Sequence, residues 1–218
     1  MIDALADICR NNLYRDKLLL VPSYAVGQNI VETLSEKTPV LNLKIGTIQS
    51  IAAETGMPLL GDLGMTLADD GISRHIMFCV IYNMLRNNEF EYFTDILLTP
   101  SISNSIWNAV MEIKYAGIDY DNLDESSFVN ARKGRDIKKI IAVYDTELKK
   151  QGIADYPGLI NIILQNGRKE DTLLLVPNNI KLRLLEKKLI AGKFGSIRIL
   201  YGSPVNGINV PHSYYSAG

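Results

Sequence analysis

Two short polar segments carry the side chains best suited to binding chemistry in this chain of 218 residues. Ser23 and Tyr24 offer a hydroxyl, an aromatic face and backbone N–H groups at a predicted helix start. Thr47, Gln49 and Ser50 offer three polar side chains at the next one. Aromatic faces stack on bases, and hydroxyl and N–H groups donate to phosphates. These five residues are candidate contacts for single-stranded nucleic acid, and Ser23 and Thr47 also suit the simpler role of N-caps.

The sequence contains few candidates for catalytic residues. No GxxxxGK[ST] phosphate-binding loop occurs, and Pro177-Asn178-Asn179 offers no carboxylate for magnesium. His75 and His212 stand apart, and no His, Cys or acid cluster has metal-ligand spacing. The acids of residues 119–125 suit a polar linker and lack EF-hand spacing. The sequence therefore predicts no catalytic residue, no cofactor site and no metal site.

A repeat identifies the elements that position the two polar segments. Residues 16–22 read DKLLLVP and residues 171–177 read DTLLLVP, with six of seven positions identical. Each apolar run is typical of a strand buried in a parallel sheet, and each proline marks the end of its strand. Helical patterns follow at residues 25–34 and 180–190. We expect the two strands to be neighbours or near-neighbours in one parallel sheet, with ligand-binding loops at their carboxyl ends.

The rest of the pattern predicts an α/β layer that carries an all-helical insertion. Short strands are expected at residues 41–45 and 196–200, and helices at residues 2–13 and from 47 to about Gly56. Residues 57–64 are expected to form a turn-rich connector. Insertion helices are expected at residues 73–87, 91–98, 103–115, 136–150 and 155–165. The predicted boundaries are residues 1–64 and 166–218 for the α/β core and 65–165 for the insertion.

The composition is that of an ordinary globular chain. Hydrophobic residues make up 47%, charged residues 22%, and the net charge is −1. A near-neutral chain has no global field that attracts nucleic acid, so any such binding must be local. Cys9 and Cys79 are too few for a disulfide scaffold and suit buried thiols in a reducing cytoplasm. No signal-peptide layout and no long apolar run point to a membrane.

The order of the strand-end segments resembles the front of a superfamily 1 helicase motor. Residues 18–24 look like the strand and loop of motif Ia, and residues 45–52 look like motif Ib. Within that group the chain is most similar to AddB/RexB-type subunits of bacterial helicase–nucleases. Residues 112–118 and 136–140 resemble their insertion, and residues 154–160 resemble the segment that closes it. The resemblance implies a RecA-like (P-loop NTPase-like) sheet, DNA repair or recombination, and a partner helicase–nuclease subunit.

The chain differs from these helicase motors in the motifs that bind and hydrolyse ATP. The Walker A strand and loop are absent before residues 2–13, and Pro177-Asn178-Asn179 replaces the Walker B acids. Residues 200–204 replace motif III without its acid. Because ATP hydrolysis needs a phosphate cradle and positioned magnesium, the resemblance implies a motor-like fold without ATPase activity. The resemblance further implies that such a domain binds single-stranded or duplex DNA or acts as a scaffold.

We expect the chain to be the N-terminal portion of a longer protein. AddB-type subunits carry a PD-(D/E)XK nuclease near the C-terminus, and the tail at residues 210–215 has no core pattern. Two other readings stay open: a protein-interaction scaffold without DNA binding, and a fragment of an unrelated α/β enzyme. The near-neutral charge favours the scaffold. The loop with Thr47, Gln49 and Ser50 favours DNA.

Overall fold

A computed structural model describes residues 1–202, which form two compact units. The first unit contains residues 1–51, 168–181 and those from 191 onward, and the second contains residues 52–167 and 182–190. Residues 203–218, which include His212 and the tail at residues 210–215, lie outside the described residues. In residues 1–202, no helix combines the length and apolar character that crossing a membrane requires.

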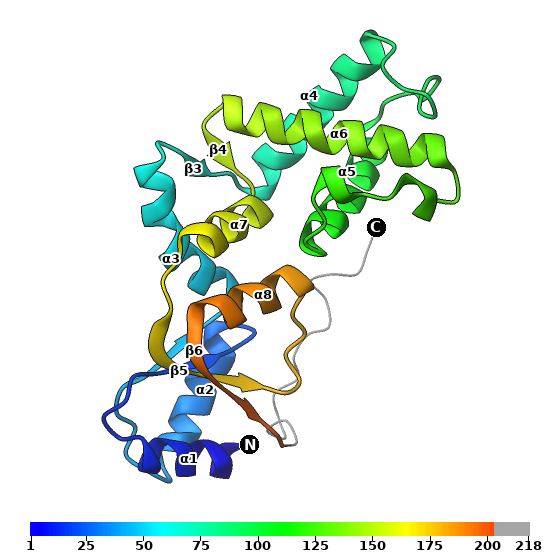
Figure 1. Ribbon diagram of the computed structural model, residues 1–218. Helices are drawn as coiled ribbons and strands as arrows, with labels where there is room; N and C mark the ends of the chain where they lie inside the picture. Colours follow the sequence, from blue (N-terminus) through cyan, green and yellow to red (C-terminus); the bar gives the residue numbers. More distant parts are fainter. Residues whose placement is uncertain (203–218) are drawn as a thin grey trace. The chain divides into compact units, whose positions relative to one another are not determined.

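The first unit is built on a parallel sheet of four strands (Figure 1). Its order is β2-β1-β5-β6. The strands are β1 (Lys17–Leu20), β2 (Leu43–Gly46), β5 (Glu170–Pro177) and β6 (Phe194–Leu200). The two copies of the repeat lie side by side, with Leu18 opposite Leu174 and Leu19 opposite Leu175. The predictions of an α/β fold and of two neighbouring parallel strands are confirmed.

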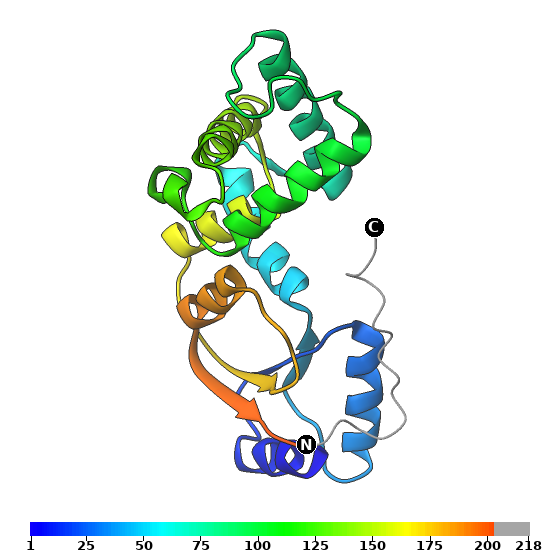
Figure 2. The ribbon, with the colours of Figure 1, turned by 90° about the vertical axis from the view of Figure 1, so that its right-hand side faces the viewer.

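Burial of the leucine runs explains why these residues form central strands. Leu19 and Leu20 point to opposite faces of the sheet and are both buried. On one face, Leu19 packs in a cluster with residues of α1 (Ile2–Asn11) and α2 (Tyr24–Ser35), such as Leu5 and Leu34. Figure 2 shows α2 alongside the sheet. Each fully buried leucine contributes about 1.5–3 kcal/mol, so the repeat anchors this unit.

The second unit is mostly helical. Its main helices are α3 (Ile48–Asp62) from residue 52 onward, α4 (Asp70–Arg86), α5 (Pro100–Tyr115), α6 (Ala131–Lys150) and α7 (Tyr156–Asn166). Two 3₁₀ turns lie before α6, at Tyr120–Asn122 and Glu125–Ser127. The apolar sides of α4, α5 and α6 form one core around Met77, Val110 and Tyr144. The starts of α4, α5 and α7 are capped by Asp69, Thr99 and Asp155, which accept backbone N–H bonds.

One predicted helix, at residues 91–98, is wrong. The backbone N–H groups of Glu91, Tyr92 and Phe93 instead donate to the carboxylate of Asp136, at 3.0, 2.8 and 3.1 Å. Asp136 is fully buried at the start of α6. Because this carboxylate satisfies successive N–H groups, the segment forms an irregular loop with no unpaired donors at these positions.

The predicted connector at residues 57–64 is also wrong, since α3 continues through it to Asp62. A side chain at Gly56 would collide with Leu159, so this glycine allows α3 to approach α7 closely. Residues 52–62 therefore belong to the second unit, and the first boundary lies near residue 51 rather than 64.

Two further features were not predicted in this form. Strands β3 (Thr66–Leu67) and β4 (Ile153–Ala154) pair in parallel, and two residues are too few to show a periodic pattern. Helix α8 (Leu184–Lys193) begins four residues later than the expected start at Ile180.

Candidate nucleic-acid interface

Both predicted polar segments follow adjacent strand ends in the first unit. Strands β1 and β2 are parallel neighbours, with Leu20 opposite Gly46, and the N–H of Val21 donates to the carbonyl of Gly46 at 2.9 Å. Ser23–Tyr24 follows β1 at the start of α2, and residues 47–50 follow β2 at the start of α3. The sheet therefore brings all five predicted residues to one edge, where two helix N-termini begin.

At the first loop, Ser23 is the N-cap of α2, and its Oγ accepts a hydrogen bond from the N–H of Val26 at 3.4 Å. A hydroxyl that accepts this bond keeps its own hydrogen for another acceptor. Tyr24 is 47% exposed, which leaves much of its ring available for stacking. Cap and ligand contact are compatible at this loop.

At the second loop, Thr47 and Ser50 bind each other. The N–H of Ser50 donates to Thr47 Oγ1 at 3.1 Å, and the N–H of Thr47 donates to Ser50 Oγ at 3.0 Å. Ser50 Oγ also donates to the carbonyl of Thr47 at 3.0 Å. The Ser50 hydroxyl is thus committed to the turn, whereas Thr47 keeps its hydroxyl hydrogen. Gln49 is exposed beside them.

The same edge carries residues that the sequence analysis did not select. Asn178 and Asn179 follow β5 and are exposed, and Tyr201 follows β6 and is 70% exposed. The N–H of Asn178 donates to the carbonyl of Leu200 at 3.0 Å, which joins these two strand ends. In the sequence these positions show only that acidic residues are absent. The signal that could have identified them is the residue type, since amides and aromatics also suit nucleic acid.

Charge is unevenly divided between the units. The first holds ten Lys and Arg against seven Asp and Glu, a net of +3. The second holds thirteen against seventeen, a net of −4, which together give the −1 of the whole chain. In the edge segments at residues 21–28, 46–51, 177–181 and 200–202 the one charged residue is Lys181. The edge thus presents no carboxylate from these segments to repel a phosphate.

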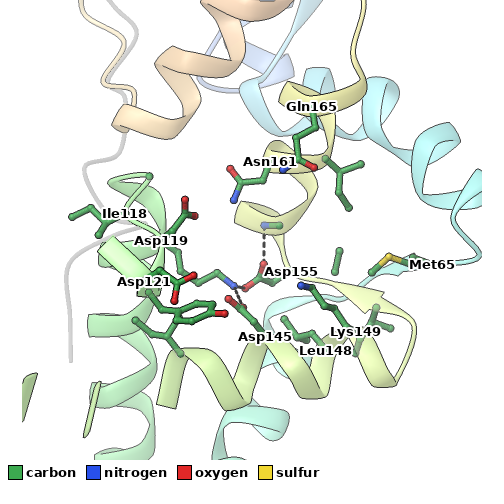
Figure 3. Close-up of a pocket in the computed structure, with 18 of the residues that line it drawn as sticks. Met65, Ile118, Asp119, Asp121, Asp145, Leu148, Lys149, Asp155, Asn161 and Gln165 are labelled. Atoms are coloured by element: carbon green, nitrogen blue, oxygen red, sulfur yellow. Dashed lines mark hydrogen bonds and ion pairs between the residues drawn. The ribbon is translucent and has the colours of Figure 1, made fainter. Parts of the chain in front are cut away.

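A pocket of about 380 Å³ lies within the helical unit (Figure 3). It is lined by α5, α6, α7, β4 and the loop at residues 118–122. Lys114 is buried at this site, and its Nζ donates to Asp145 and to Asp155 at 2.6 Å each. The second oxygen of Asp155 accepts the N–H of Gly158 at 2.8 Å, which caps α7.

Electrostatics gives this lysine a structural role. Burial lowers the pKa of Lys114, but attraction to Asp155 and Asp145 outweighs it, and the net shift is upward. Burial raises the pKa of Asp145, against the pull of Lys114. A lysine held protonated is neither a nucleophile nor a base. The ion group instead joins α5, α6 and α7, and its members lie 31 and 41 residues apart, too far for a sequence pattern to reveal.

No group of three or more His, Cys, Asp or Glu side chains in residues 1–202 is arranged to hold a metal ion. A scan against models of known protein families matches none of them, and a search of curated proteins finds no significant match.

Proposed function

We propose that this chain is a non-catalytic, DNA-binding N-terminal domain of an AddB/RexB-type helicase–nuclease subunit in DNA repair or recombination. In this proposal the parallel sheet is RecA-like and lacks ATPase activity. The observation that supports it best is the placement of Ser23–Tyr24 and of residues 47–50 on adjacent strand ends. Those are the segments that resemble motifs Ia and Ib.

Binding would use the carboxyl edge of the first unit. Phosphates meet the N-termini of α2 and α3, where backbone N–H groups and the free hydroxyl hydrogens of Ser23 and Thr47 lie. Tyr24 stacks on a base, which contributes roughly 1–3 kcal/mol. The net charge of +3 on this unit adds a modest attraction, so binding is weak and falls as salt rises.

The test is fluorescence anisotropy with labelled single-stranded DNA at low salt. Tyr24→Ala should weaken binding by roughly 5- to 150-fold, the equivalent of one lost stacking contact. Thr47→Ala should weaken it less. Tyr14→Ala is the matched control, because Tyr14 is 87% exposed and precedes β1, at the opposite end of the sheet. Equal effects of the two tyrosine variants would contradict the site.

A protein-interaction scaffold is the second candidate, favoured by the outer strand of the sheet. Strand β6 lies at the end of the strand order and exposes Ile197 (43%) and Ile199 (51%). Exposed edge strands pair readily with other polypeptides. If wild-type protein does not bind single-stranded or duplex DNA at low salt, the scaffold function replaces DNA binding.

A further inference from the structure

Helix α4 presents a thiol and an imidazole together on its outer side. His75 and Cys79 are four residues apart, which places them on one face of the helix. Cys79 Sγ lies 3.7 Å from His75 Nε2. His75 is exposed and Cys79 half-buried, whereas the other cysteine, Cys9, is 1% exposed in the first unit. The pair is therefore accessible to a ligand from solvent.

This separation matches two ligands of one tetrahedral metal ion. With Zn–S near 2.3 Å and Zn–N near 2.0–2.1 Å, a tetrahedral angle puts sulfur and nitrogen roughly 3.5 Å apart. The pair thus needs an adjustment of only a few tenths of an ångström to share a metal. Its helix is 17 residues long and capped by Asp69, and the opposite side packs into the core through Met77, Ile81 and Met84. The helix holds the two side chains in register.

We propose that His75 and Cys79 form a two-ligand site for a thiophilic divalent metal ion of the Zn²⁺ class. A thiolate and an imidazole favour such ions over Mg²⁺ or Ca²⁺, which prefer oxygen. The thiol proton is released when the Cys79 sulfur binds the metal. Two coordination positions stay open for water or an external ligand, because no third His, Cys, Asp or Glu joins the pair among residues 1–202. The site is independent of the proposed DNA interface.

The experiment uses the full chain, freed of metal by chelation and kept reduced with a phosphine. Co²⁺ is titrated first, because sulfur coordination gives a charge-transfer band in the near ultraviolet. Zn²⁺ should then displace one equivalent of Co²⁺ per chain and remove the band. Cys79→Ser should abolish the band, and His75→Gln should weaken metal binding at least about tenfold, since even outer-shell changes cost that much.

Cys9→Ala is the matched control, because it removes the buried thiol and should leave the band unchanged. Both His75 and Cys79 lie on the outer side of a capped helix, so their variants should stay folded, which circular dichroism checks. Metal binding without a sulfur band would overturn the proposal. So would a band that survives Cys79→Ser, or affinity that His75→Gln leaves unchanged.

Discussion

The hydroxyl groups at the candidate interface differ in their hydrogen bonds. Ser50 uses its hydroxyl hydrogen within its own turn, while Thr47 and Ser23 accept N–H bonds and keep theirs. Of the five predicted residues, only Ser50 commits its hydroxyl hydrogen to the loop. The other four have groups left for a ligand, and these are Ser23, Tyr24, Thr47 and Gln49. The residue types were visible in the sequence. The hydrogen-bond directions that separate them depend on the turn itself.

Lys114 links three helices of the helical unit through its ion pairs with Asp145 and Asp155. Lys114→Met should lower the free energy of unfolding by about 3–5 kcal/mol, because it leaves the buried carboxylate of Asp155 without its cation. Urea unfolding followed by fluorescence of Trp107, the one tryptophan of the chain, measures this. Lys150→Met is the control: its ion pair with Glu147 is exposed, and losing it should hardly change stability. Equal effects would refute the assigned role.

Alkaline pH should weaken the same unit. Burial raises the pKa of Tyr115 from 10.0 to about 12, and it also raises the pKa of Tyr144. The pKa of Lys114 is raised by its two carboxylate partners. Groups with a raised folded pKa stabilise the fold fully below their unfolded pKa and lose that contribution as pH rises through the folded value. Stability should thus fall between about pH 10 and pH 12. Urea midpoints at pH 8, 10 and 11.5 test this, and Tyr115→Phe should flatten the decline.

Helices and strands set by local sequence patterns could be predicted, whereas those set by contacts between distant residues could not. Helices α2, α4, α5 and α7 were predicted because each has its own apolar period and a capping residue beside it. The false helix at residues 91–98 arose because its competitor, Asp136, lies more than 40 residues away. The close approach of α3 to Leu159 at Gly56 is likewise a contact between distant residues, which no local pattern shows.

Asp136 gives a prediction at this scale. Asp136→Ala should destabilise the protein by about 1–3 kcal/mol, because the buried N–H group of Phe93 and the part-buried N–H groups of Glu91 and Tyr92 lose their acceptor. Asp136→Asn keeps one carbonyl oxygen and should cost less. Thermal unfolding of both variants, with exposed Asp95→Ala as control, gives the order. If Asp136→Ala is as stable as the control, the carboxylate does not organise this loop.

Across the whole molecule, a near-neutral net charge conceals two units of opposite sign. Sequence periodicity predicted the parallel sheet and the helical segment between its strands. It did not reveal the charge division, because the first unit is assembled from segments separated by more than 100 residues. The low overall charge had been read as favouring a scaffold. The basic unit that carries the candidate edge now weighs towards DNA.

We also expect no ATP turnover. The sequence lacks a phosphate-binding loop, and β5 ends in Pro177-Asn178-Asn179 without an acid for magnesium. In a coupled assay with Mg²⁺, ATP and single-stranded DNA, the rate of ATP hydrolysis should be the same with the protein as with buffer alone. ATP hydrolysis that requires Mg²⁺ and co-elutes with the protein in two different chromatographic steps would contradict this prediction.

The central claim, that nucleic acid binds at the carboxyl edge of the first unit, is tested most directly by photo-crosslinking. Single-stranded DNA that contains 5-bromodeoxyuridine is irradiated with the protein at low salt, and the linked peptides are identified by mass spectrometry. We expect crosslinks to Tyr24 and Tyr201, which follow β1 and β6 at that edge, and none to the exposed Tyr14. Crosslinks that concentrate at Tyr14 or in the acidic helical unit, or their complete absence, would contradict it.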